Sequence, residues 1–300
     1  MHAFSMMTWN TAGLQDPKDF YKNVSQHKIV FIQEYGLSEL HIIDEDYMGA
    51  FIVFLAPMDA LRPKRRICTV AIQSKDVEEI VARHSCAWGL ALEWTSRSLM
   101  KRCAAVSLHL ANSWNSQEDF MIAVAEADRM MKKIKACTIF LGMDANVELP
   151  TFNVEGFSIV GEATNGCADA RTTEVCHMLA SREMCCINTL GPKQECAPTR
   201  GVWEDKDNPQ KLFDYLACTI TDGEATTYVD TDDMKKWTST DHCPVVANMN
   251  VVVKAGPPLR LDNADPNVYP KHEKVAKGWK DDGGFDAAVD TLQVRNNVTL

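Results

Sequence analysis

An acid and an imidazole stand side by side near the end of the chain, and these two residue types suit metal binding and proton transfer. Residues 239–244 read Ser-Thr-Asp-His-Cys-Pro, and an apolar run begins at Val245. Proline at the start of a strand costs no ladder hydrogen bond, so Asp241 and His242 are predicted in the loop just before a buried strand. Loops on a rigid scaffold often carry chemistry. Taken alone, the pair fits better a turn with a capping aspartate and a surface histidine.

Polar residues at other predicted strand ends strengthen the functional interpretation. Asn10 ends an apolar segment over 4–9, and Glu34 follows a strand predicted over 28–32. Later strand ends carry His109 with Asn112, and Asp144 with Asn146. Asp214 lies inside the apolar run 212–216, where a carboxylate is costly to bury unless it is paired.

These residue types suit a hard divalent cation. Asn10, Glu34 and Asp241 supply the carboxylate and amide oxygens that Mg²⁺ prefers, with Mn²⁺ as the alternative ion. Asp144 and Asn146, two residues apart in a predicted extended loop, point to the same side and are predicted to position a water molecule and a phosphate oxygen.

Asp214 is the predicted partner of His242. A neighbouring carboxylate holds an imidazole in one tautomer and raises its pKa, so that the ring can donate a proton to a developing negative charge. A histidine such as His109, taken alone, is more often a satisfied core residue than a catalyst.

Composition indicates a soluble globular protein. The chain has 300 residues, 46% apolar and 24% charged, and its net charge of −10 argues mildly against a broad nucleic-acid-binding surface. A basic cluster at 62–66, including Arg65 and Arg66, fits a phosphate-contacting loop and a solvated hairpin tip about equally. Eleven cysteines without a Cys-x-x-Cys pair favour core thiols in a reducing compartment. Without a signal peptide or a membrane span, we expect an intracellular protein of the nucleus or cytoplasm.

Many short strands and a few helices predict a layered α/β (α+β) protein with largely antiparallel sheets. Residues 1–253 form the predicted domain, and 254–300 are predicted to be a polar tail with one short helix. Asp16 and Ser116 are predicted to cap helices, as is Thr173 before a helix over 175–183. A short strand is predicted over 187–190.

Six short motifs in order resemble the endonuclease/exonuclease/phosphatase superfamily across residues 4–253. They are Trp9-Asn10, Gln33-Glu34, His109-x-x-Asn112, Asp144-x-Asn146, Phe213-Asp214-Tyr215 and Thr240-Asp241-His242-Cys243-Pro244-Val245. The resemblance implies a four-layered αββα sandwich, DNase-like, with the site at one rim of two sheets. Two departures are Met143, which separates Gly142 from Asp144, and Thr240 in place of the usual serine.

The resemblance also implies roles in phosphodiester hydrolysis. Glu34 is the main metal ligand, with Asn10 and Asp241 near the metal. Asp144 orients or deprotonates the attacking water, and Asn146 binds a phosphate oxygen. The remaining motif residues act around the phosphate: His242 stabilises the charged transition state with support from Asp214, and His109 and Asn112 lie beside the phosphate.

The region 171–190, followed by Pro198-Thr199-Arg200-x-x-Trp203, resembles the endonuclease domains of non-LTR retrotransposons. This implies a monomeric Mg²⁺-dependent DNA endonuclease in which Arg65, Arg66, Trp203 and Asn112 contact the substrate. Two alternatives stay open: another phosphohydrolase of the superfamily, acting on RNA, poly(A) or inositol phosphates, or a catalytically silent protein that only binds nucleic acid. The intact acidic and histidine positions favour activity, whereas the net charge keeps the small-molecule and RNA substrates in consideration.

Overall fold

The computed structural model describes residues 2–36, 50–56, 67–112, 115–162, 164–190, 198–200, 211–219, 225–229, 237–238 and 240–251. All of them lie within the predicted domain 1–253, and the boundary at 253 stays a prediction. The predicted tail over 254–300 and the predicted substrate contacts Arg65, Arg66 and Trp203 lie outside the described residues.

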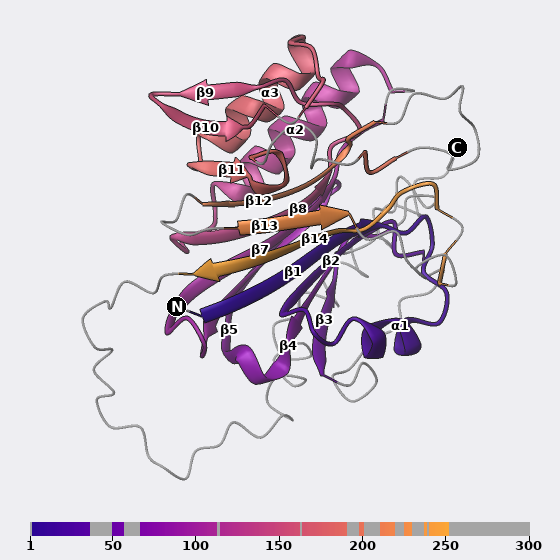
Figure 1. Cartoon of the computed structure of the whole chain (residues 1–300), viewed down its shortest axis with the longest axis vertical. Helices are drawn as coiled ribbons and strands as arrows, with labels where there is room; N and C mark the ends of the chain where they lie inside the picture. Colours follow the sequence, from indigo (N-terminus) through magenta and orange to yellow (C-terminus); the bar gives the residue numbers. More distant parts are fainter. Residues whose placement is uncertain are drawn as a thin grey trace, which may run out of the picture. The chain divides into compact units, whose positions relative to one another are not determined.

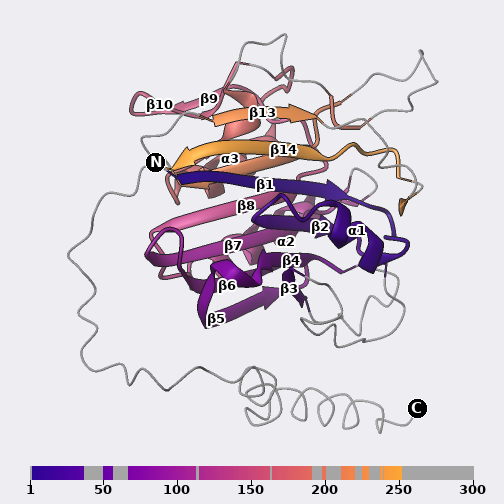
Figure 2. The same ribbon diagram turned by 60° about the horizontal axis from the view of Figure 1, so that its bottom comes forward.

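The described strands form two sheets (Figures 1 and 2). The first sheet has the order β13 (Ala225–Val229), β14 (Val245–Val251), β1 (His2–Asn10), β2 (Ile29–Gln33), β4 (Thr69–Gln73) and β3 (Phe51–Leu55). The second has the order β5 (Val77–Cys86), β6 (Gly89–Ser96), β7 (Lys101–His109), β8 (Thr138–Asp144), β12 (Asp214–Thr219), β11 (Met184–Cys186), β10 (Phe157–Val160) and β9 (Phe152–Val154).

Helices cover the outer faces of both sheets. In Figure 1, α2 (Gln117–Met131) and α3 (Ala170–Ala180) lie on one side of the molecule and α1 (Pro17–Asn23) on the other. Phe20 and Tyr21 of α1 pack on the outer face of the first sheet, and Phe120 of α2 packs on that of the second. Among the described residues, no helix is both long and apolar enough to cross a membrane.

A shared apolar core lies between the sheets. Phe4 of β1 stacks on Phe140 of β8 with ring centroids 4.7 Å apart. Gly142 is required there, because a Cβ atom at this position would lie 2.4 Å from the ring of Phe31 on the facing sheet. Helices outside two packed sheets make four layers, so the predicted αββα sandwich is confirmed.

Two parallel strand pairs bring polar residues to one rim. β1 runs parallel to β2, with Asn10 opposite Gln33, and β7 runs parallel to β8, with His109 opposite Asp144. Asp214 opens β12 directly across from Asp144. The ends of strands from both sheets therefore meet at the same edge of the sandwich.

Three local predictions differ from the structure. Asp144 is the last residue of β8 rather than part of a loop. The third helix begins at Ala170 because Asp169, not Thr173, accepts the backbone N–H of Thr172 as its N-cap. Ile187–Thr189, predicted as part of a strand, forms a 3₁₀ turn (η2), since the strand pairing of β11 ends at Cys186.

Candidate active site

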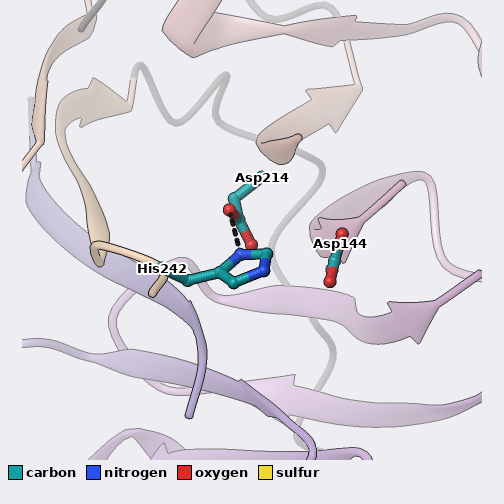
Figure 3. Close-up of side chains that lie close together, drawn as sticks. All are labelled: Asp144, Asp214 and His242. Atoms are coloured by element: carbon teal, nitrogen blue, oxygen red, sulfur yellow. Dashed lines mark hydrogen bonds and ion pairs between the residues drawn. The ribbon is translucent and has the colours of Figure 1, made fainter. Parts of the chain in front are cut away.

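A buried histidine–aspartate pair forms the centre of the rim (Figure 3). His242 Nδ1 lies 2.8 Å from Asp214 Oδ2, and both side chains are buried. His242 lies in the loop before β14, where the indole N–H of Trp9 donates to its carbonyl oxygen at 3.0 Å. An ionised carboxylate only accepts hydrogen bonds, so Nδ1 carries the proton and Nε2 is turned to the rest of the site.

The surroundings of His242 favour its protonated form. Burial by itself would lower its pKa, but the carboxylate of Asp214, with those of Asp144 and Asp241, outweighs burial and raises the pKa to about 9. This shift favours the imidazolium, which can donate a hydrogen bond from Nε2. Burial and the charge of Asp144 raise the pKa of Asp214 as well, against the opposing charge of His242.

Asp144 is fixed by two donors at the end of β8. Its Oδ2 accepts from Asn10 Nδ2 at 2.7 Å, and its Oδ1 accepts from the backbone N–H of Asn146 at 2.9 Å. Asn146 adopts a left-handed backbone with φ of 53°, and its side chain donates to the carbonyl oxygen of Leu110 at 2.9 Å. The predicted metal ligand Asn10 and the predicted catalytic residues Asp144 and Asn146 thus form one connected group.

His109 and Glu34 lie at the more open part of the rim. His109 Nε2 is 3.7 Å from both Glu34 Oε1 and Asp144 Oδ2, and the His109 and Glu34 side chains are 23% and 27% exposed. Asn112, three residues beyond His109, is exposed to solvent. The structure therefore brings His109 and Glu34 to Asp144 and leaves Asn112 on the surface.

Asp241 points to a cation from another segment. Its Oδ2 lies 3.0 Å from Arg200 Nε, and its Oδ1 lies 3.8 Å from His242 Nε2. Burial raises the pKa of Asp241, but the bond from Arg200 and the charge of His242 outweigh burial and lower it. This predicted metal ligand is thus ion-paired with a guanidinium in the structure.

The donor set fits a hard divalent cation. Asp144, Asp214 and His242 offer ligand atoms that all lie within 4.8 Å of one another, which makes them a possible metal cluster. His242 Nδ1 is already bonded to Asp214, however, and Mg²⁺ prefers oxygen ligands. The carboxylate of Glu34 and the amide oxygen of Asn10 therefore suit such an ion better.

Thr199 lies near the pair but was not predicted as a site residue. Thr199 is fully buried, and its Oγ1 accepts the backbone N–H groups of Phe213 and Asp214, both at 3.0 Å. Its carbonyl oxygen accepts from the backbone N–H of Cys243 at 2.7 Å. Thr199 thus joins the two segments that carry the pair, and the adjacent Arg200 reaches Asp241. In the sequence, Thr199 and Arg200 stood out only as part of the Pro198-Thr199-Arg200 motif. That motif does not indicate which distant residues they contact.

Asn188 supports Asp214 from the other side. Its Nδ2 donates to the carbonyl oxygen of Asp214 at 3.0 Å, and its Oδ1 accepts from the backbone N–H of Leu216 at 3.0 Å. The side chain of Asn188 in η2 thereby continues the pairing of β11 with β12 as far as the first residue of β12.

The two packed sheets and their outer helices are the fold of solved structures described as endonuclease/exonuclease/phosphatase proteins, from Beutenbergia cavernae and Bacteroides thetaiotaomicron. Solved structures with this fold include the endonuclease domain of TRAS1, a telomere-specific non-LTR retrotransposon, at 14% identity and a TM-score of 0.56, covering 83% of this chain and 99% of that one. The abasic-site endonuclease LMAP from Leishmania major is 13% identical with a TM-score of 0.57, covering 83% of this chain and 88% of that one.

The 3′ phosphatase NExo from Neisseria, solved with a product DNA hairpin, is 11% identical with a TM-score of 0.60, covering 82% of this chain and 99% of that one. No family model and no curated protein matches the sequence. At these identities the likeness is one of fold.

Proposed function

We propose that the chain is a Mg²⁺-dependent DNA endonuclease of the non-LTR retrotransposon type, which hydrolyses a phosphodiester by metal-assisted attack of water. The observation that carries the proposal is the 2.8 Å contact between Asp214 and His242 beside the Asn10–Asp144–Asn146 group. The similarity to the TRAS1 endonuclease domain and to a 3′ phosphatase solved with DNA supports DNA as the substrate.

Asp144 is the proposed general base. Asn10 and the backbone of Asn146 hold both of its carboxylate oxygens in place, and each oxygen keeps a further lone pair to accept the proton of a water molecule. The fixed orientation reduces the entropy lost when the water is aligned with the phosphorus atom.

His242 is the proposed donor to the developing charge. The imidazolium presents the Nε2 proton while Asp214 holds Nδ1, so the ring needs no reorientation as negative charge grows on a phosphate oxygen. His109 and Asn146 lie on the Asp144 side, where we propose that they contact the same phosphate group.

Glu34 and Asn10 are the proposed ligands of Mg²⁺, with Mn²⁺ as an alternative, and the bound ion supplies charge neutralisation at the phosphate. The Asp241 carboxylate is the third predicted ligand; it is paired with Arg200, and its Oδ1 lies 3.8 Å from His242 Nε2. The left-handed backbone of Glu34, with φ of 53°, turns the chain at the end of β2.

The experiment that tests the proposal is nicking of supercoiled plasmid and of an abasic-site duplex, in Mg²⁺, in Mn²⁺ and in chelator. We expect metal-dependent nicking that Asp144→Asn abolishes. The matched control is Glu79→Gln, which removes the charge of an exposed carboxylate on β5. Failure of the wild-type chain to nick either DNA, with either ion present, would refute the proposed endonuclease activity.

The same preparation separates the alternatives. Hydrolysis of RNA, poly(A) or inositol phosphates without nicking would identify another phosphohydrolase, an alternative that the net charge of −10 supports. Retained DNA binding without hydrolysis of any substrate would identify a silent binding protein. For a nuclease, Arg65→Ala with Arg66→Ala is expected to weaken DNA binding, whereas a small-molecule phosphatase keeps its turnover of a short substrate.

A further inference from the structure

Two cysteines face each other on neighbouring strands beside the candidate site. Cys185 of β11 is directly opposite Cys218 of β12 in an antiparallel pair. Directly opposite residues have Cα atoms about 4.5–5.5 Å apart, and disulfides span Cα distances of about 4.4–6.8 Å. The pairing register therefore brings the two thiols within reach of a covalent bond.

Both thiols occupy the same layer of the molecule. Cys185 and Cys218 belong to the core between the two sheets, and they are 8% and 3% exposed. The neighbouring Cys186 faces the opposite layer, under α3, where Cys176 also lies. Each side of the sheet thus has its own cysteines, and only Cys185 and Cys218 are strand partners among the described residues.

The two thiols interact with each other. The neighbouring Cys218 thiol lowers the pKa of Cys185, whereas Cys185 together with burial raises the pKa of Cys218. A thiolate is the reactive form of cysteine, so this asymmetry makes Cys185 the nucleophile and Cys218 the residue that resolves its oxidised form.

We propose that Cys185 and Cys218 form a dithiol site that a peroxide converts reversibly into a disulfide, and that this conversion slows the reaction of the candidate site. The second half of this proposal rests on the proposed function. In the first step the Cys185 sulfur attacks one peroxide oxygen, so that an S–O bond forms, the O–O bond breaks and the second oxygen leaves as water. The Cys218 sulfur then attacks the Cys185 sulfur, the S–S bond forms, and the S–O oxygen leaves as a second water with the Cys218 proton.

The link to the site runs through Asn188. It follows Cys185 by three residues, and its side chain holds the carbonyl oxygen of Asp214 and the N–H of Leu216, two residues before Cys218. A covalent bond between β11 and β12 draws the two sulfur atoms together, and the strand segments that carry them shift next to these contacts. Asp214, and with it His242, is then displaced from its reduced-state position.

Peptide mapping of the reduced full-length chain after treatment with dilute hydrogen peroxide tests the site itself. We expect the chain to lose the mass of two hydrogen atoms, with a cross-link between the Cys185 and Cys218 peptides that a thiol reductant removes. Cys185→Ala and Cys218→Ala should each prevent the cross-link, whereas Cys186→Ala, which alters the adjacent thiol on the other face, should not. Absence of the cross-link in the wild-type chain, or a cross-link between other cysteines, would overturn the proposal.

Nicking by the reduced and the oxidised chain tests the coupling. We expect oxidation to slow nicking roughly tenfold, within the hundredfold that a 1 Å misplacement can cost, and reductant to restore it. Peroxide should leave nicking by Cys218→Ala unchanged. An oxidised chain that nicks at the reduced rate would overturn the coupling. A chain that never nicks would overturn the proposed function, and the peptide map would still decide the dithiol site.

Discussion

Two buried carboxylates, each hydrogen-bonded to a histidine, lie near opposite ends of β8 and differ in how their charge is balanced. One is Asp214 with His242 at the candidate site, where β8 ends. The other is Glu93 with His84, near the segment just before β8. Both carboxylates are fully buried, so their surroundings rather than their depth distinguish them.

The charge of Glu93 is balanced within its own hydrogen-bond network. Arg102 Nε donates to Glu93 at 2.8 Å and His84 Nε2 lies at 3.1 Å, while the backbone N–H groups of Lys135 and Ala136 donate at 3.0 and 2.9 Å. Burial raises the pKa of Glu93, but these donors outweigh it and lower the pKa. One permanent cation balances one carboxylate, and the network fastens β5, β6 and β7 to the segment before β8.

The charges around the pair at the site are not balanced in this way. His242 is the cation for Asp214, but Asp144 and Asp241 also face the ring, and Glu34 lies 3.7 Å from His109 at the same rim. Carboxylates outnumber the described cations, His242 and Arg200, at this end of the sheet. A network in which charges balance suits a structural role, whereas carboxylates in excess of the described cations suit a ligand-binding role.

Neutralising Asp214 should reduce activity more than any other change. Asp214→Asn keeps the size of the side chain but removes the charge that protonates and orients His242. We expect nicking to fall by about 10²–10⁴-fold, the range for loss of a general acid or base. Rate measurements beside Glu79→Gln provide the check, and a wild-type rate for Asp214→Asn would contradict the role of the pair.

The matching change in the Glu93 network should act on stability instead. Glu93→Gln removes the charge that pairs with Arg102 and places amide hydrogens near the N–H groups of Lys135 and Ala136. We expect a loss of about 2–3 kcal/mol in the free energy of unfolding, measured by urea denaturation, with nicking of the folded chain unchanged. A variant as stable as wild type would show that the charge of Glu93 does not stabilise the fold. Glu78→Gln, an exposed carboxylate on β5, is the control.

Substitutions of Thr199 test whether its hydroxyl group is needed to position Asp214. Thr199→Val keeps the shape but loses the oxygen that accepts from Phe213 and Asp214, whereas Thr199→Ser keeps that oxygen. We expect nicking to fall roughly tenfold in the valine variant through misplacement of Asp214, and to stay near wild type in the serine variant. Equal rates for the two variants would show that the hydroxyl does not position Asp214.

The smallest effect is the acid dependence of stability. The pKa of Glu93 is lower in the folded chain than in the unfolded one, so its contribution is fully present above the ordinary glutamate pKa of about 4.3 and is lost as the pH falls through the folded value. Below that pH, we expect the free energy of unfolding to decline less steeply in Glu93→Gln than in wild type. Parallel declines in denaturation series from pH 3 to 6 would contradict this contribution.

Local chemistry allowed much of this architecture to be predicted. Asp214 stands between apolar neighbours, where a buried carboxylate needs a partner, and His242 precedes a proline-marked strand; the structure pairs them at 2.8 Å. The roles of the metal ligands and of the catalytic residues stay predictions. Apolar runs located most strands, but not their ends, since β8 extends to Asp144 and β12 to Thr219.

Long-range contacts could not be predicted from spacing. Thr199 acts through backbone groups of residues 213, 214 and 243, and no local pattern marks such partners. The ion pair of Arg200 with Asp241 depends in the same way on how two distant segments meet. The cap of α3 was wrong for a local reason, because Asp169 competes better than Thr173 for the first free N–H groups of the helix.

The hydrogen bond between Asn10 and Asp144 joins residues separated by 134 positions, and β1 is paired along its length with β14. During synthesis on a ribosome, β1 emerges well before β14 and must therefore wait for it before this sheet is complete. Contacts of such long sequence separation slow folding and leave strand edges exposed in the nascent chain. A chain that folds in this order completes its candidate site only after β14 has been translated.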